Sequence, residues 1–403
     1  MRIASTSRRK PLLDRKGPTK MDFDFSADQV MLRNLAREFL TEQCPIAHVR
    51  VMMDDPRGYD TGIYRQLIQL GMLPFPEAYG GSGLGMVEQA IILEEMGRIP
   101  YPGPYFATVI LAGSAIIHAN DDNAKSRYLP DVCNGDLTMT LAFLEDAIGW
   151  GPSEVSLSMT KEGSFYRLKG TKRFVPYGHT ADVILVTGRT GDAGAGGISI
   201  IAVPRDAAGL SIRADVMMDM TTRTATLIFD DVRVPAENLI GTENEGWPVL
   251  EATFRVAAVG ASAEMLGAAR KSLEMSVDYA KVRKQFGQFI GQFQAVKHKL
   301  AEMLEKVEGA HSAVYYAAWA LDADAPDAVL ASSVAKSALN EASRSVCGEA
   351  IQVHGGIGFT WEYDLHIYFK RAKHLEPFYG NTEHHRELAL QEVLAGRVAS
   401  ASH

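Results

Sequence analysis

Two short segments in the C-terminal half of the chain decide the fold: RKQFG at residues 283–287 and QVHGGIGFT at residues 352–360. The first segment ends a long helical pattern that begins near Val249. Its arginine could pair with a phosphate group through a fixed fork of N–H donors, and its phenylalanine could pack on a flat ring. Taken alone, the segment is equally typical of an ordinary helix end, with a cationic last turn and a glycine terminator.

The second segment follows an alanine-rich helical pattern and contains the paired glycines Gly355 and Gly356. Paired glycines let a backbone approach a pyrophosphate closely, although a glycine after a helix is also a common stop signal. Another glycine-rich stretch, at residues 79–85, is different. It lacks the Lys-Ser/Thr pair of a phosphate loop and the acidic residue of a dinucleotide-binding unit, so we predict a tight turn there.

Outward from these segments, hydrophobic periodicity divides the chain into three zones. Helical spacing over residues 21–135 begins with Ser26 and Gln29, the pattern of a capping box. A spacing of two, with β-branched residues between turn signals, covers residues 136–245, and long helical patterns return over residues 246–397. We therefore predict an α+β multidomain fold: an N-terminal helical domain, a central antiparallel β-barrel or sandwich, and a C-terminal domain like a four-helix bundle. The expected strands cover residues 137–145, 164–169, 183–187, 198–203 and 224–229.

Composition excludes several classes of protein. The chain has 403 residues and a net charge of −8, which gives no basic surplus for nucleic-acid binding. It contains no run of about 18 apolar residues, so we expect no membrane insertion. Three separated cysteines without a CxxC pair favour a reducing cytoplasm over a disulfide framework. Residues 1–20 hold seven Lys or Arg against Asp14 alone, which predicts a disordered basic leader.

In their order and spacing, these segments resemble the acyl-CoA dehydrogenase family over roughly residues 21–395. Two further segments agree: KGTKRF at residues 169–174, similar to the family's flavin-facing β segment, and FDDVRVP at residues 229–235, similar to the exit from that domain. The resemblance implies an FAD-dependent enzyme that oxidises an acyl-CoA thioester to its α,β-enoyl product. It also implies a dimer or tetramer with FAD at the subunit interface, an electron-transferring flavoprotein as acceptor, and a role in fatty acid or steroid catabolism.

The resemblance assigns candidate binding residues as well. FAD is expected to contact Arg283, Phe286 and Gln294. The adenosine-pyrophosphate end of a flavin held by a neighbouring subunit is expected to meet Gln352, Gly355 and Gly356. The remaining assignments are Phe174 beside the isoalloxazine ring, Thr382 in contact with the cofactor, and Arg255 in contact with the substrate.

The family pattern breaks where the catalytic base is expected. In most members this base is a Glu within a Tyr-Glu-Gly-Thr sequence, which removes the α-proton of the thioester. The matching stretch here is FYGNT at residues 378–382, so Gly380 occupies the position of the base. Some members carry the base on the long helix instead, at a position that corresponds to Phe254. The catalytic residue therefore stays unknown from the sequence.

Other departures surround this position. The family's Thr-Glu-Pro loop is reduced at residues 144–150, and Pro176 stands where a flavin-facing hydroxyl is expected. Together with Gly380, the altered loop suggests extra room for a bulky or branched acyl group. His384 and His385 are adjacent, which is poor spacing for two metal ligands on one helix face, so we expect no metal site and treat them as replacements for polar residues near the flavin.

Three hypotheses follow. In the first, the chain is a subunit without a base in a hetero-oligomeric acyl-CoA dehydrogenase, like bacterial members with unlike subunits that act on steroid side-chain CoA esters. In the second, it is a self-sufficient homo-oligomeric enzyme whose base lies elsewhere, with Glu145 as one candidate. In the third, it is a binding or scaffold protein that has kept the fold and lost the reaction. The retained flavin residues argue against the third hypothesis.

Overall fold

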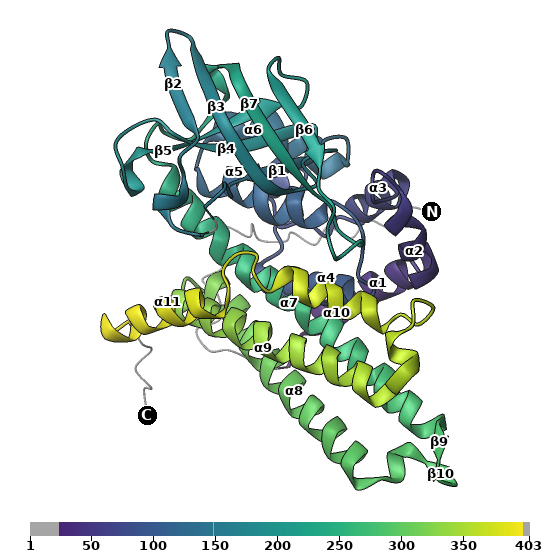
Figure 1. The fold of residues 1–403 in the computed structure, drawn as a ribbon. Helices are drawn as coiled ribbons and strands as arrows, with labels where there is room; N and C mark the ends of the chain where they lie inside the picture. Colours follow the sequence, from purple (N-terminus) through teal and green to yellow (C-terminus); the bar gives the residue numbers. More distant parts are fainter. Residues whose placement is uncertain (1–23, 148, 398–403) are drawn as a thin grey trace, which may run out of the picture.

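The computed structural model describes residues 24–147 and 149–397, and the leader expected over residues 1–20 lies outside them. Along the described chain, helices come first, a sheet follows, and long helices come last (Figure 1). The predicted fold class is confirmed. In Figure 1 the sheet packs above the long helices, and the first helices lie beside both.

The N-terminal helices begin at the predicted capping box. The Ser26 hydroxyl accepts a hydrogen bond from the Gln29 N–H at 3.2 Å, and the Gln29 side chain accepts one from the Ser26 N–H at 3.0 Å. A π-helix, Phe106–Gly113, leads into α5, and its first residue, Phe106, packs against the main hydrophobic core. The α-helices of this part are α1 Ala27–Gln43, α2 Ile46–Asp54, α3 Thr61–Gln69, α4 Met86–Arg98, α5 Ser114–His118 and α6 Asp122–Asn134.

One sheet forms the central part, in the strand order β6-β7-β3-β2-β4-β5-β8. Its strands are β1 Met139–Ala142, β2 Ser158–Glu162, β3 Phe165–Pro176, β4 Val183–Arg189, β5 Ile198–Pro204, β6 Leu210–Ala214, β7 Thr224–Pro235 and β8 Leu239–Ile240. Most pairs are antiparallel as predicted, but β4 runs parallel to β1 and meets the start of β2 in the same direction. The wholly antiparallel prediction is wrong there, because the β2–β3 hairpin intervenes before the chain returns beside β1.

The C-terminal helices are α7 Gly246–Val282, α8 Gln294–Asp322, α9 Ala328–His354, α10 Leu365–Leu375 and α11 Thr382–Leu394, with the short hairpin of β9 Lys284–Gln285 and β10 Gln288–Phe289 after α7. The 37 residues of α7 give it a length of about 55 Å. It runs from the sheet to the far end of the helices, where Figure 1 shows the β9–β10 hairpin. Positions at the two ends of α7 are therefore well separated.

Two glycines allow α4 and α7 to cross at close range. A Cβ atom on Gly97 would lie 2.0 Å from the carbonyl oxygen of Glu264, and one on Gly267 would lie 1.9 Å from that of Glu94. Real Cβ atoms essentially never approach so closely. The backbones therefore touch without intervening side chains, which fixes how α7 lies against the N-terminal helices.

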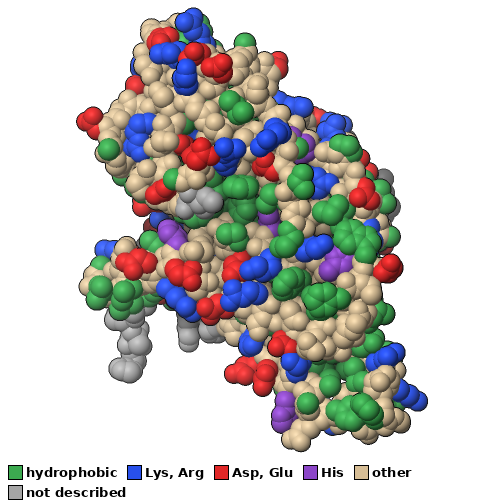
Figure 2. Space-filling view, viewed as in Figure 1, with side chains coloured by type: hydrophobic (Ala, Val, Ile, Leu, Met, Phe, Trp, Pro, Cys, Tyr) green, Lys and Arg blue, Asp and Glu red, His purple; other side chains and the backbone are tan. Residues whose placement is uncertain are grey.

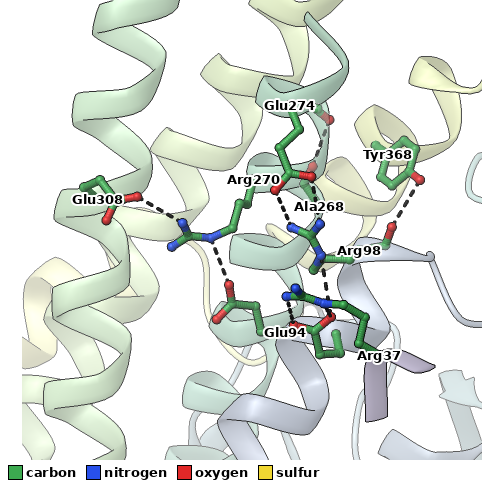
Figure 3. A network of polar contacts seen from close by, with 10 residues as sticks. Arg37, Glu94, Arg98, Ala268, Arg270, Glu274, Glu308 and Tyr368 are labelled. Atoms are coloured by element: carbon green, nitrogen blue, oxygen red, sulfur yellow. Dashed lines mark hydrogen bonds and ion pairs between the residues drawn. The ribbon is translucent and has the colours of Figure 1, made fainter. Parts of the chain in front are cut away.

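Charged side chains brace the same crossing (Figure 3). Arg98 of α4 donates to both carboxylate oxygens of Glu274 on α7, at 2.8 and 2.7 Å. In return, Arg270 of α7 donates to Glu94 of α4 and to Glu308 of α8, at 3.0 Å each. Because each of these three carboxylates accepts from a guanidinium group on another helix, the network fixes α4, α7 and α8 relative to one another.

No helix in the described ranges is long and apolar enough to cross a membrane. The three cysteine thiols, Cys44, Cys133 and Cys347, are buried and free. Burial raises the pKa of the Cys133 thiol to about 11, so at neutral pH it is a neutral, weakly nucleophilic group. Among residues 24–147 and 149–397, no group of three or more His, Cys, Asp or Glu side chains could hold a metal ion.

Candidate active site

Apart from Arg255, the residues assigned from the sequence fall into two groups at opposite ends of α7. The distal cluster, at the hairpin end, consists of Arg283, Phe286, Gln294, Gln352, Gly355 and Gly356. The proximal cluster, where the sheet meets the helices, consists of Phe174, Gly380 and Thr382. Phe254, on α7, lines the same small cavity as Phe174. Arg283, the C-terminal cap of α7, comes 29 positions after Phe254, so the two residues are about 43 Å apart along the helix axis. This span exceeds the length of an extended FAD molecule, so one chain cannot offer both clusters to one flavin.

The distal cluster is a surface of exposed residues. All six members are exposed, and the Phe286 ring is 92% accessible at a backbone φ of 49°. Figure 2 shows hydrophobic side chains gathered at this lower end of the molecule. The C-terminal ends of α9 and α7 lie side by side: the ring of His354 on α9 stacks on that of Tyr279 on α7, with a centroid separation of 4.3 Å. The arginine and the paired glycines are thereby brought to the same end.

The backbone of the distal cluster can bind a phosphate group, and the Phe286 ring can bind a planar ring of a ligand. Cβ atoms built on Gly355 and Gly356 would meet nothing within 4 Å, and Gly355 has a φ of +64° that favours glycine. Bare backbone of this kind, beside the Arg283 guanidinium, can accept a pyrophosphate. The open Phe286 ring can stack on a flavin or adenine ring. These residues fit FAD, as far as one chain can hold it.

At the proximal cluster, Phe174 lies in a β-bulge of β3. The register of β3 against β7 shifts between Lys172 and Val175, and Phe174 has a φ of 50°. A bulge redirects the side chain, and here it turns the Phe174 ring toward a cavity shared with Phe254 and Tyr379. Thr382 begins α11 and is buried. The structure brings these residues to the same region as Gly380.

Histidine side chains crowd Gly380, the position that the sequence matches to the family's glutamate. Gly380 has a φ of +105°, and a Cβ atom there would lie 2.5 Å from Nε2 of His385 and 2.6 Å from Cδ2 of His384. The His385 Nε2–H donates to the Tyr379 carbonyl oxygen at 2.8 Å. Burial, aided by the Lys336 ammonium, lowers the pKa of His385 to about 3, so the ring is neutral. The extra room expected beside Gly380 is absent, because the two imidazoles take it.

Lys336, on α9, stabilises the turn at Gly380 through hydrogen bonds to its backbone. The three N–H bonds of its buried ammonium are shared among four acceptors: Asn340 Oδ1 at 2.6 Å and the carbonyl oxygens of Leu375, Glu376 and Gly380 at 3.1 Å each. Burial lowers its pKa to about 7. Since these carbonyls include the end of α10, the lysine caps that helix and fixes the Gly380 turn. Sequence reasoning missed this role, because the two segments are far apart along the chain.

Aromatic side chains close the space between Phe174 and the Gly380 turn. The Trp150 indole N–H donates to the Pro377 carbonyl oxygen at 3.1 Å, and its ring lies 5.3 Å from Phe254 and 5.4 Å from Tyr379. The cavity left among them has a volume of about 20 Å³. Figure 2 shows hydrophobic side chains gathered between the sheet and the helices below it. Nothing in the spacing of the sequence singled out Trp150.

Glu145, the base considered from the sequence, is already engaged. Its carboxylate accepts from the Lys172 ammonium at 2.7 Å and from the N–H groups of Ser156 and Leu157 at 3.1 and 3.0 Å. Burial alone would raise its pKa, but Lys172 and these hydrogen bonds outweigh burial and lower it. A carboxylate held as an anion in this way is a weak proton acceptor, so Glu145 is a structural ion pair.

Another carboxylate, on Glu264 of α7, does line a cavity beside Tyr379. That cavity has a volume of about 40 Å³ and is also lined by Phe106. Burial raises the pKa of Glu264, an effect that its ion pair with Arg371 at 3.1 Å only partly offsets. Arg371 also pairs with Asp219 at 2.9 Å. Among the described residues that line the two cavities beside Tyr379, Glu264 is the only carboxylate.

Arg255 faces elsewhere. It lines a cavity of about 570 Å³ together with His118 and Asp322, near the start of α4 and the turn between α8 and α9. Tyr379 and Phe174 do not line that cavity. The structure therefore does not bring Arg255 together with the proximal cluster, although the sequence assigned it to the substrate.

Comparison with known proteins agrees with this architecture. Family profiles for the acyl-CoA dehydrogenase N-terminal, middle and C-terminal domains match residues 26–136, 145–232 and 244–394. A probable acyl-CoA dehydrogenase of Bacillus subtilis is 31% identical, covering 93% of this chain and 100% of its own. The structure of butyryl-CoA dehydrogenase from Megasphaera elsdenii has a TM-score of 0.86 at 29% identity, over 93% of this chain and 100% of its own. The ChsE4–ChsE5 complex from Mycobacterium tuberculosis gives 0.84 at 27% identity, over 93% and 99%. The chain belongs to the acyl-CoA dehydrogenase family, whose members are FAD-dependent oxidoreductases acting on the CH–CH bond of acyl-CoA.

Proposed function

We propose that the chain is a subunit without a catalytic base in a hetero-oligomeric, FAD-dependent acyl-CoA dehydrogenase that desaturates the α,β bond of an acyl-CoA thioester. One observation carries this proposal: glycine replaces the expected glutamate, and the His384 and His385 rings occupy the space of its side chain. A side chain cannot return to that position without displacing a ring. In this proposal the α-proton of the substrate passes to a carboxylate on another chain.

In this proposal the chain contributes to the reaction by binding FAD through the distal cluster. FAD, when bound, would accept a hydride from the β-carbon of the acyl group. Arg283 would pair with its pyrophosphate, Gly355 and Gly356 would approach the same group through bare backbone, and Phe286 would pack on a ring. Because these residues lie about 43 Å from Phe254, we infer that they serve a flavin whose reactive ring lies in an adjoining chain. Gln294 and Gln352 belong to the same surface.

A self-sufficient homo-oligomer is the alternative, and Glu264 is the observation that favours it. Its carboxylate lines a cavity beside Tyr379 and has a raised pKa, as a general base near neutral pH requires. In that case Phe174 and Thr382 would flank the flavin of the same chain. The pairing of Glu264 with Arg371 argues for a structural role, so we place this alternative second. A scaffold protein would not need the open glycine cradle of the distal cluster.

Co-expression with an unlike family member that retains its glutamate tests the proposal. We expect the mixed assembly to bind FAD and to oxidise acyl-CoA. Arg283→Ala in this chain should lower the flavin content at least about tenfold, whereas Phe174→Ala should leave it within about twofold. In a self-sufficient homo-oligomer both substitutions would remove flavin, and the chain would be active by itself. An electron-transferring flavoprotein as acceptor, a place in fatty acid or steroid catabolism and a cytoplasmic location form part of the same proposal.

A further inference from the structure

Trp150 joins the two parts of the molecule that face each other across the proximal cluster. It lies on the connection between β1 and β2, and its indole donates to the Pro377 carbonyl just before the Gly380 turn. Its ring packs on Phe143 at 5.7 Å, Phe254 at 5.3 Å and Tyr379 at 5.4 Å. A residue of the central part therefore reaches the C-terminal part at the place where an acyl group and a flavin ring would have to lie.

The space enclosed between Trp150 and Tyr379 is too small for a substrate, and neither residue lines the cavity of about 580 Å³ that Phe174 shares with residues of the central part. The cavity lined by Trp150, Phe174 and Tyr379 has a volume of about 20 Å³, room for about one water molecule. The cavity beyond Phe106 and Tyr379 has about 40 Å³. Even a short acyl thioester is larger than either. Trp150 itself is only half-buried, so it closes the site from its solvent side.

The wall opposite Trp150 is held by contacts of its own. Phe106 stacks on Tyr379 at 5.3 Å with an interplanar angle of 20°, behind the ring that Trp150 contacts. The Gly380 turn is held by Lys336 at 3.1 Å and through the hydrogen bond from His385 to Tyr379. The wall opposite Trp150 is thus fixed, and opening the site requires Trp150 to leave it.

We propose that Trp150 is the residue that excludes acyl groups from this chain, so that the chain supplies its distal flavin surface while the acyl group binds in the partner. This inference rests on the proposed function, and it adds the residue that decides which chain takes the substrate. The ligand class excluded is the acyl portion of a CoA thioester, whatever the affinity of the chain for the CoA portion.

The test compares hexanoyl-CoA with coenzyme A by titration calorimetry on the full chain in the presence of FAD. The variants are Trp150→Gly, which opens the space, and Trp150→Leu, which keeps an apolar side chain and guards against loss of folding. Trp319→Leu is the matched control, because Trp319 is also half-buried but lies on α8. Thermal melting shows that each variant is folded before it is titrated.

The wild-type chain and Trp319→Leu are expected to bind the two ligands with affinities within about threefold of each other. Both Trp150 variants are expected to bind hexanoyl-CoA at least about tenfold more tightly than coenzyme A, equivalent to about 1.4 kcal/mol. A tenfold preference for hexanoyl-CoA in the wild-type chain would overturn the proposal, and so would a folded Trp150→Leu chain without the preference. Failure of the proposed function would show instead as missing flavin in the mixed assembly, an independent readout.

Discussion

A Cβ atom on Gly380 would lie 2.5 Å from Nε2 of His385, so the imidazole occupies the space that any side chain at position 380 would need. The Gly380 backbone also has a φ of +105°, which L-residues rarely adopt. Two obstacles thus stand against restoring the base by a single substitution.

Gly380→Ala should destabilise the chain by about 1 to 3 kcal/mol, because both the backbone and the His385 contact are strained. Gly380→Glu should give no desaturation in the chain alone. Gly396→Ala separates the two causes, since Gly396 has a φ of +70° with nothing within 4 Å of a built Cβ. Denaturant unfolding and flavin bleaching are the measurements. A stable Gly380→Glu chain that bleaches flavin by itself would refute this view of the turn.

Gly267→Ala should destabilise the chain by about 3 kcal/mol or prevent folding, because its Cβ would lie 1.9 Å from the Glu94 carbonyl oxygen where α4 and α7 cross. The control is Gly309→Ala on the exposed face of α8, where a Cβ meets nothing within 4 Å. The Gly309→Ala change should raise the free energy of unfolding by up to about 1 kcal/mol, because alanine favours the helix more than glycine does. Urea unfolding of both variants checks the contrast, and equal midpoints would show that the helices do not touch as described.

Arg371→Met should cost about 3 to 5 kcal/mol, because it leaves the Asp219 and Glu264 carboxylates buried without their cation. Arg386→Met is the surface counterpart. Arg386 pairs with Glu341 at 2.7 Å, but both side chains are about half exposed, so the loss should be below about 1 kcal/mol. If guanidinium chloride unfolding gave similar losses for both, the buried cluster would not stabilise the fold.

The buried His385 should make the free energy of unfolding depend on pH in the acidic range. Its folded pKa is about 3 and its unfolded pKa about 6.5, so between these values the unfolded state binds a proton that the folded state does not. Stability is therefore lost as the pH falls from 6.5, by roughly 3 kcal/mol at pH 4. His385→Gln keeps a donor for the Tyr379 carbonyl and should flatten this dependence. His298→Gln, at an exposed site, should not, and parallel pH profiles for all three chains would contradict the assignment.

Periodicity predicted the long helices well, because each buries one continuous stripe. It missed β2 and β6, since both strands are exposed along most of their length and lack the alternation that marks a half-buried strand. The bulge at Phe174 was also unpredicted. It follows from the register of β3 against β7, which pairing across the sheet decides.

The distal and proximal clusters also differ in how well the sequence predicts them. The distal cluster consists of residues close together in two local motifs at helix ends, so their neighbourhood could be predicted from the sequence. The proximal cluster depends on residues from distant segments, namely Trp150, Glu264 and Lys336, whose meeting is a product of tertiary packing. Tertiary packing also decides that Arg255 lines a cavity separate from the proximal cluster, and its contact with the substrate stays a prediction.

The most direct test of the central claim is the visible spectrum of the protein expressed alone, followed by anaerobic addition of mixed acyl-CoA esters. A chain without its own base should either lack flavin or hold flavin that stays oxidised, and should gain turnover only with an unlike partner. Bound flavin that bleaches in the chain alone would mean a complete active site, and it would contradict the account.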